Sequence, residues 1–114
     1  MSAVYVNNLI INTGSSFSQT FTLEEFQTNS LLNLSQYQVQ AQMRKWSGST
    51  SATDFTVVID TPATSGRITL SLTSEETKNL KPGRYLYDVL VTDPYSIKSR
   101  VVEGNVLVRE GVTK

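Results

Sequence analysis

Carboxylates have the clearest potential for catalysis in this sequence, because a pair of them can act as general acid and base without being adjacent along the chain. The main candidates form no D-x-D or E-x-x-E grouping. They are Asp54, Asp60, Asp88, Asp93, Glu103 and Glu110. A glycosidase pair therefore stays open, but most of these residues are interpreted as solvated surface and turn positions. Asp88 lies in the middle of a predicted strand, where a cross-strand ion pair with Arg84 or Arg100 is expected.

Other catalytic chemistry is sharply restricted by composition. The chain has no cysteine and no histidine, which removes thiol nucleophiles, thiolate zinc sites and the commonest general base. A Ser-Lys dyad stays open, but G-x-S-x-G is absent. Gly14-Ser15-Ser16 lacks the lysine of a phosphate loop, and no loop carries the oxygen ligands of a calcium site. We therefore predict a protein that is not an enzyme and binds no cofactor or metal.

The charge balance also restricts the partners. Ten basic and ten acidic residues give a net charge of zero, without the basic stripe of a nucleic-acid binder. No apolar stretch reaches membrane-spanning length, and residues 1–4 lack the basic and apolar regions of a signal peptide. We expect synthesis in a cytoplasm and no contact with nucleic acid or membrane.

Short segments of alternating polarity, separated by turn residues, are typical of half-buried antiparallel strands. Thr73-Ser74-Glu75-Glu76 matches a capping box and predicts one short helical turn near 74–80. The fold expected over residues 1–114 is a single all-β domain, an antiparallel β-sandwich of about seven strands, with barrel closure as the alternative. The predicted strands are Val4–Asn12, Phe17–Leu23, Tyr37–Trp46, Phe55–Ile59, Arg67–Leu72, Tyr85–Val91 and Ile97–Val108.

Two features are candidates for partner binding. Four long polar side chains share one face of the third predicted strand, and they suit a solvated surface or a hydrogen-bonded contact with a partner. They are Gln38, Gln40, Gln42 and Arg44. Trp46 precedes a Ser/Thr-rich loop, Ser47–Thr53, and could stack on a sugar or a partner side chain, or instead close one end of the sandwich.

The run Leu80-Lys81-Pro82-Gly83-Arg84-Tyr85 places a turn before the clearest strand in the chain. A tyrosine in that position resembles the tyrosine corner of immunoglobulin-like sandwiches, whose hydroxyl bonds to the backbone a few residues upstream. The alternative is that Tyr85 is an ordinary core residue. Either way, Leu80, Pro82, Gly83 and Tyr85 are predicted to have a structural role.

Several segments together resemble a family of small bacteriophage structural proteins with an immunoglobulin-like β-sandwich. The resemblance covers nearly the whole chain, and its motifs are mostly packing and turn signatures. Gln19 departs from it, since an apolar residue is common there. The segments are Ile11–Gly14, Phe17–Leu23, Leu34–Tyr37, Met43–Lys45, Pro82–Asp88, Thr92–Pro94 and Glu103–Val106.

The resemblance implies a virion structural protein that contributes a β-sandwich to the tail, neck, baseplate or head decoration of a phage. Its implied partners are other virion structural proteins, through sheet faces or edges. The neutral net charge is also compatible with a homo-oligomer. The alternative function is a carbohydrate- or receptor-binding module of a phage adhesion device, acting through Trp46.

Overall fold

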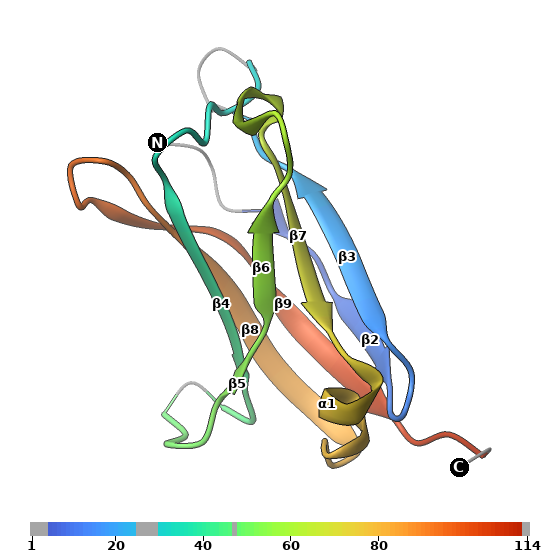
Figure 1. Ribbon diagram of the computed structural model, residues 1–114. Helices are drawn as coiled ribbons and strands as arrows, with labels where there is room; N and C mark the ends of the chain where they lie inside the picture. Colours follow the sequence, from blue (N-terminus) through green and yellow to red (C-terminus); the bar gives the residue numbers. More distant parts are fainter. Residues whose placement is uncertain (1–4, 25–29, 47, 113–114) are drawn as a thin grey trace.

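The chain folds into two β-sheets that pack face to face (Figure 1). The computed structural model describes residues 5–24, 30–46 and 48–112. The larger sheet has the order β1-β9-β8-β4-β5, with β2 also pairing with β9, and the smaller sheet has the order β3-β7-β6. The strands are β1 (Tyr5–Val6), β2 (Leu9–Asn12), β3 (Phe17–Thr22), β4 (Gln38–Arg44), β5 (Thr53–Asp54), β6 (Thr56–Ile59), β7 (Arg67–Leu72), β8 (Gly83–Thr92) and β9 (Lys98–Arg109). No ladder joins the two sheets among the described strands, so the β-sandwich is confirmed and the barrel is not.

The described residues contain nine strands, two more than predicted, because the first predicted strand is split and β5 forms at the end of the loop predicted for Ser47–Thr53. The first is interrupted at Asn7-Asn8, yet β1 and β2 continue along β9 in one register, since Tyr5 lies opposite Val102 and Leu9 opposite Val106. Both of these pairings are parallel, whereas every other described strand pairing is antiparallel. The additional strand β5 pairs with β4 in the larger sheet, whereas β6, which matches the predicted strand Phe55–Ile59, belongs to the smaller sheet.

One apolar core fills the space between the sheets. Alternation places Ile68, Leu70 and Leu72 of β7 inside, as predicted. Phe55, between β5 and β6, connects the layers, because its ring lies 6.0 Å from that of Phe17 on β3 and 6.2 Å, edge to face, from that of Tyr87 on β8. Such aromatic pairs add about 0.5–1.5 kcal/mol each to area burial.

The strand β9 contains an irregularity that the alternation pattern does not reveal. Its pairing with β8 shifts between Val89 and Leu90, so that Val101 is an extra residue and both Val101 and Val102 are buried. The register thus places the bulge at Val101 and not at Gly104.

The helix α1 (Ser74–Lys78) begins with the predicted capping box. The Thr73 hydroxyl accepts from the Glu76 N–H at 3.2 Å, and the Glu76 carboxylate accepts from the Thr73 N–H at 2.9 Å. Thr77 is fully buried and donates to the Ser15 carbonyl at 2.8 Å, which ties α1 to the turn between β2 and β3. A short 3₁₀ helix, η1 (Ala63–Ser65), lies before β7. Among the described residues, no helix has the length and apolarity needed to cross a membrane.

Side chains after residue 30 and at the edge of β3 lie at the border of the core. Of the leucines after residue 30, Leu32 and Leu34 are buried and contribute to the core, whereas Leu31 is half exposed. Gln19 lies half-buried on the inner face of β3, at the edge of the smaller sheet. Its amide donates to the Thr20 carbonyl at 3.4 Å, so the edge position accommodates a polar group facing inward.

Candidate functional site

Tyr85 stands at the beginning of β8 and makes the hydrogen bond expected of a tyrosine corner. Its hydroxyl donates to the carbonyl of Lys81 at 2.7 Å, and the Lys45 ammonium lies 4.7 Å from its ring centroid. Leu80 packs against the core from the turn, and Gly83 has φ 143°, a value that favours glycine. The four predicted corner residues therefore lie in one turn, where they position β8.

We expect Tyr85→Phe to lower the free energy of unfolding by about 0.5–1.5 kcal/mol while the fold is retained. The cost is modest because the Lys81 carbonyl lies in an exposed turn, where water can replace the lost hydroxyl. Urea denaturation of both proteins measures the difference. No loss of stability would mean that Tyr85 contributes only as a packed ring.

Tyr87 occupies the centre of the large sheet, two residues after the corner tyrosine. In antibody domains this position carries the second cysteine of the disulfide between the sheets. Here the buried Tyr87 ring packs against Phe55, and the Tyr87 hydroxyl donates to the carbonyl of Asn7 at 2.5 Å. Burial raises the pKa of Tyr87 to about 12, because the phenolate would lose its solvation. At this position the chain has a ring contact with Phe55 and a partly buried hydrogen bond to Asn7.

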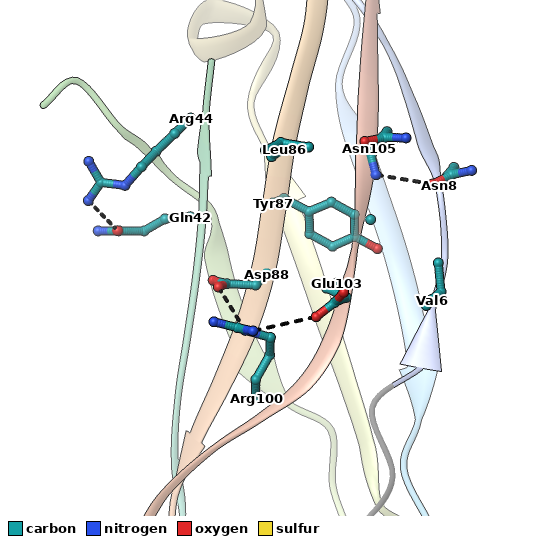
Figure 2. Close-up of a pocket in the computed structure, with 11 residues that line it drawn as sticks. Val6, Asn8, Gln42, Arg44, Leu86, Tyr87, Asp88, Arg100, Glu103 and Asn105 are labelled. Atoms are coloured by element: carbon teal, nitrogen blue, oxygen red, sulfur yellow. Dashed lines mark hydrogen bonds and ion pairs between the residues drawn. The ribbon is translucent and has the colours of Figure 1, made fainter. Parts of the chain in front are cut away.

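The contact with Asn7 explains the interruption between β1 and β2. In an uninterrupted parallel ladder, the Asn7 carbonyl would accept from the N–H of Asn105. Instead it accepts from Tyr87, while the Asn105 N–H donates to the side-chain oxygen of Asn8 at 3.0 Å (Figure 2). Gly104 lies opposite Tyr87 and directly under this exchange, where a Cβ would overlap the Asn7 carbonyl oxygen and lie 2.8 Å from its carbon. The backbone approach therefore requires glycine at position 104.

The four polar residues of β4 lie on one face of the strand as predicted, but they are not equivalent, because the three glutamines are exposed and Arg44 is half-buried. The Gln42 amide donates to Asp54 at 2.6 Å, and Arg44 donates to Gln42 at 3.2 Å and to the Ser49 carbonyl at 2.5 Å. These bonds connect β4 to β5 and to the loop that follows β4. Gln38 and Gln40 make no side-chain hydrogen bond within the described part of the chain. The sequence predicted a uniform row of donors, whereas the structure leaves only its first half open to a partner.

Trp46 lies beyond the end of β4 and is 59% exposed. It does not join the polar row in one concavity, because Gln42 and Arg44 line a hollow from which Trp46 is absent. In the loop predicted for residues 47–53, the Ser49 N–H donates to the Trp46 carbonyl at 3.0 Å, and residue 47 lies outside the described residues. The partner-binding residues predicted from sequence therefore fall into two separate places.

The hollow lies on the outer face of the large sheet and has a volume of about 510 Å³ (Figure 2). Arg100 joins two carboxylates there, with its guanidinium 3.2 Å from Asp88 and 3.6 Å from Glu103. Of the two partners expected for Asp88, Arg100 is the one that pairs with it. Both carboxylates are partly exposed and share one guanidinium, without the apolar enclosure typical of a general acid. No group of three metal-ligating side chains occurs among the described residues.

Apolar side chains also lie on this outer face, and sequence reasoning missed them as a surface. Leu86 on β8 is 43% exposed, Leu107 on β9 37%, Ile10 on β2 55% and Val6 on β1 74%. Leu107 pairs directly with Ile10, and it lies two residues from Asn105, the partner of Leu86. The residues Leu86, Leu107 and Ile10 thus form an oblique row across three strands, called here the apolar row. In the sequence, each of the three is an apolar residue between two apolar or aromatic residues that point to the core.

Comparison with known proteins supports the fold. No protein-family model and no curated protein matches the chain. The SrpA adhesin R347E mutant from Streptococcus sanguinis is similar in structure, with a TM-score of 0.53, 12% identity and coverage of 95% of this chain and 56% of that chain. The Listeria monocytogenes internalin-like protein lmo2027 has a TM-score of 0.44, 19% identity and coverage of 96% of this chain and 29% of that chain. Murine CRIg has a TM-score of 0.44, 9% identity and coverage of 91% of this chain and 92% of that chain.

The adhesin and the internalin-like protein are longer than this chain, which spans 56% and 29% of their lengths. At a sequence identity of 12%, the similarity to the adhesin is evidence for the fold alone. Together with the strand order and the Tyr85 corner, it supports the fold class, an immunoglobulin-like β-sandwich.

Proposed function

We propose that this chain is a non-enzymatic structural protein of a bacteriophage particle, which binds neighbouring virion proteins through the outer face of its large sheet. The observation that carries the proposal is the composition of that face. It combines the exposed apolar row with polar groups that are already held in place by bonds within the domain. Such preorganised groups lose little freedom when a partner binds, which favours association.

The phage setting is supported by the sequence resemblance to small phage structural proteins, which runs from Ile11–Gly14 to Glu103–Val106. The position within the particle would be the tail, neck, baseplate or head decoration. The non-enzymatic role is supported by the open surroundings of Asp88 and Glu103, because an enclosed pocket is the usual site of catalysis. Localisation in the virion after synthesis in the host cytoplasm follows from the same proposal.

Mass spectrometry of purified virions tests this function, and the chain is expected among the structural proteins of the particle. Complementation with variants then tests the face. Leu86→Glu should reduce incorporation about tenfold or more, because a charge would be buried in the contact. Val58→Glu is the matched control, since Val58 is 52% exposed on the smaller sheet. Absence of the chain from virions would reject the proposal, and equal incorporation of both variants would reject this face as the contact.

A second candidate function rests on the exposure of Trp46. An exposed indole beside a polar loop can stack on a sugar ring, as in a carbohydrate- or receptor-binding module. A glycan array with the wild type, Trp46→Ala and Tyr95→Ala tests this candidate. Tyr95 is a suitable control because it is also an exposed aromatic residue, in the turn between β8 and β9 at the opposite end of the sandwich (Figure 1). A glycan signal that only Trp46→Ala removes would support this function, and no signal, or one that Trp46→Ala leaves intact, would contradict it.

A further inference from the structure

The apolar row divides the outer face of the large sheet into two sides of different charge. Along β8, the outward positions are Arg84, Leu86 and Asp88 in succession, about 7 Å apart. Glu103 lies opposite Asp88 on β9, and Leu107 lies opposite Arg84. Arg84 is therefore on one side of the row, and the two carboxylates are on the other.

The charges on the two sides are left incompletely balanced within the domain. Arg100 is the one cation bound to Asp88 and Glu103 among the described residues, so this cluster keeps one negative charge in excess. Arg84 makes no ion pair or side-chain hydrogen bond within the described part of the chain. Each domain thus presents one unpaired cation and one uncompensated carboxylate on opposite sides of an apolar row.

We infer that this face binds a second copy of the chain, with a two-fold axis lying along the apolar row. The inference rests on the proposed function and deepens it by naming the partner. Rotation about the row places each apolar side chain against its own copy and turns Arg84 of each domain towards the acidic cluster of the other. A two-fold contact must be self-complementary in this way. The net charge of zero adds no overall repulsion between the copies.

The area of the face is sufficient for such a contact. The strands β9, β8 and β4 hold 12, 10 and 7 residues, and β1 and β2 lie end to end along β9 within residues 5–12. At about 3.3 Å per residue and about 4.8 Å between strands, they present about 600 Å². Two copies would then bury about 1,200 Å² in total, which is at the lower end of specific interfaces and above most adventitious contacts. The expected dimer is therefore a reversible one that forms at micromolar concentrations.

Sedimentation velocity over a concentration series tests the dimer with the pure protein. The wild type and Val58→Glu should both pass from monomer to dimer as the concentration rises. Leu86→Glu should weaken association about 30-fold or more, because the glutamates of the two domains would lie side by side at the axis. Circular dichroism shows whether each variant is folded. If the wild type is still monomeric at a protein concentration of about 100 μM, the inference is overturned.

Site-specific cross-linking tests the position of the axis. The chain has no cysteine, so Leu86→Cys introduces its sole thiol. A short bismaleimide should join two copies of Leu86→Cys far more rapidly than two copies of Val58→Cys. Equal rates for the two variants would overturn the assigned axis.

A charge exchange tests the pairing across the axis. Arg84→Glu and Glu103→Arg should each weaken the dimer about tenfold, and the double variant should recover most of the loss, because the two signs are exchanged together. Additive losses would overturn the pairing.

If the pure chain stays monomeric yet is incorporated into virions in a manner that depends on Leu86, the self-association is wrong and the proposed function stands. If the pure chain forms the dimer but is absent from virions, the self-association stands and the proposed function is wrong.

Discussion

Gly104→Ala should lower the free energy of unfolding by about 3 kcal/mol, at the upper end of the usual costs of overpacking. The added Cβ would overlap the Asn7 carbonyl oxygen, which is a backbone atom and cannot rotate away. To relieve the overlap, the segment between β1 and β2 must move away from β9, and the bond from Tyr87 to Asn7 then lengthens or breaks. A single methyl group thereby disturbs both packing and hydrogen bonding.

Urea denaturation measures this loss, and Gly48→Ala provides the control. A Cβ on Gly48 would meet the Trp46 side chain at 3.6 Å, an ordinary contact, so that variant should stay within about 0.5 kcal/mol of the wild type. Hydrogen exchange of the Asn105 amide should also accelerate in Gly104→Ala, since its acceptor is on Asn8. Equal stabilities of the two alanine variants would contradict the close approach at Gly104.

Alkaline pH should destabilise the wild type by up to about 2.7 kcal/mol through Tyr87 alone, as two pKa units correspond to that free energy. Tyr87 has its pKa raised from 10.0 to about 12 in the fold, so the folded state favours the neutral phenol. The stabilisation is complete below pH 10 and is lost progressively as the pH rises from about 10 to about 12, because the unfolded chain releases its proton first.

Tyr87→Phe is the variant that isolates this titration. At neutral pH it should cost about 1–3 kcal/mol, because the Asn7 carbonyl loses its partner at a partly buried contact. Between pH 10 and 12 its free energy of unfolding should fall less steeply than that of the wild type. Parallel slopes for the wild type and Tyr87→Phe would show that another group governs the alkaline transition.

The domain has no cysteine, and two tyrosines link β8 to other segments of the chain by hydrogen bonds. Tyr85 joins the beginning of β8 to the preceding turn, and Tyr87 joins the middle of β8 to Asn7. The second bond links residues 80 positions apart in the chain. Because Tyr87 also contacts Phe55, the same side chain connects the two sheets and the first strands of the chain.

Local chemistry was enough to predict much of this protein from its sequence. Alternation of apolar and hydroxylic residues identified β3 and β7, because side chains of a strand point to opposite faces. The capping box at Thr73 identified α1, and the turn before Tyr85 identified the corner. In each case the signal and its structural consequence lie within a few residues, so no knowledge of distant neighbours was needed.

Tertiary structure alone decided the features that depend on register. The pairing of β9 with both β8 and β2 places Gly104 under Asn7 and aligns Leu86, Leu107 and Ile10 into one row. It also selects Arg100, and not Arg84, as the partner of Asp88. A shift of one residue in any of these ladders would turn the row inward, and the sequence of one strand does not specify its register against another. The candidate interaction surface is therefore a product of strand pairing, whereas the sandwich itself follows from the pattern within each strand.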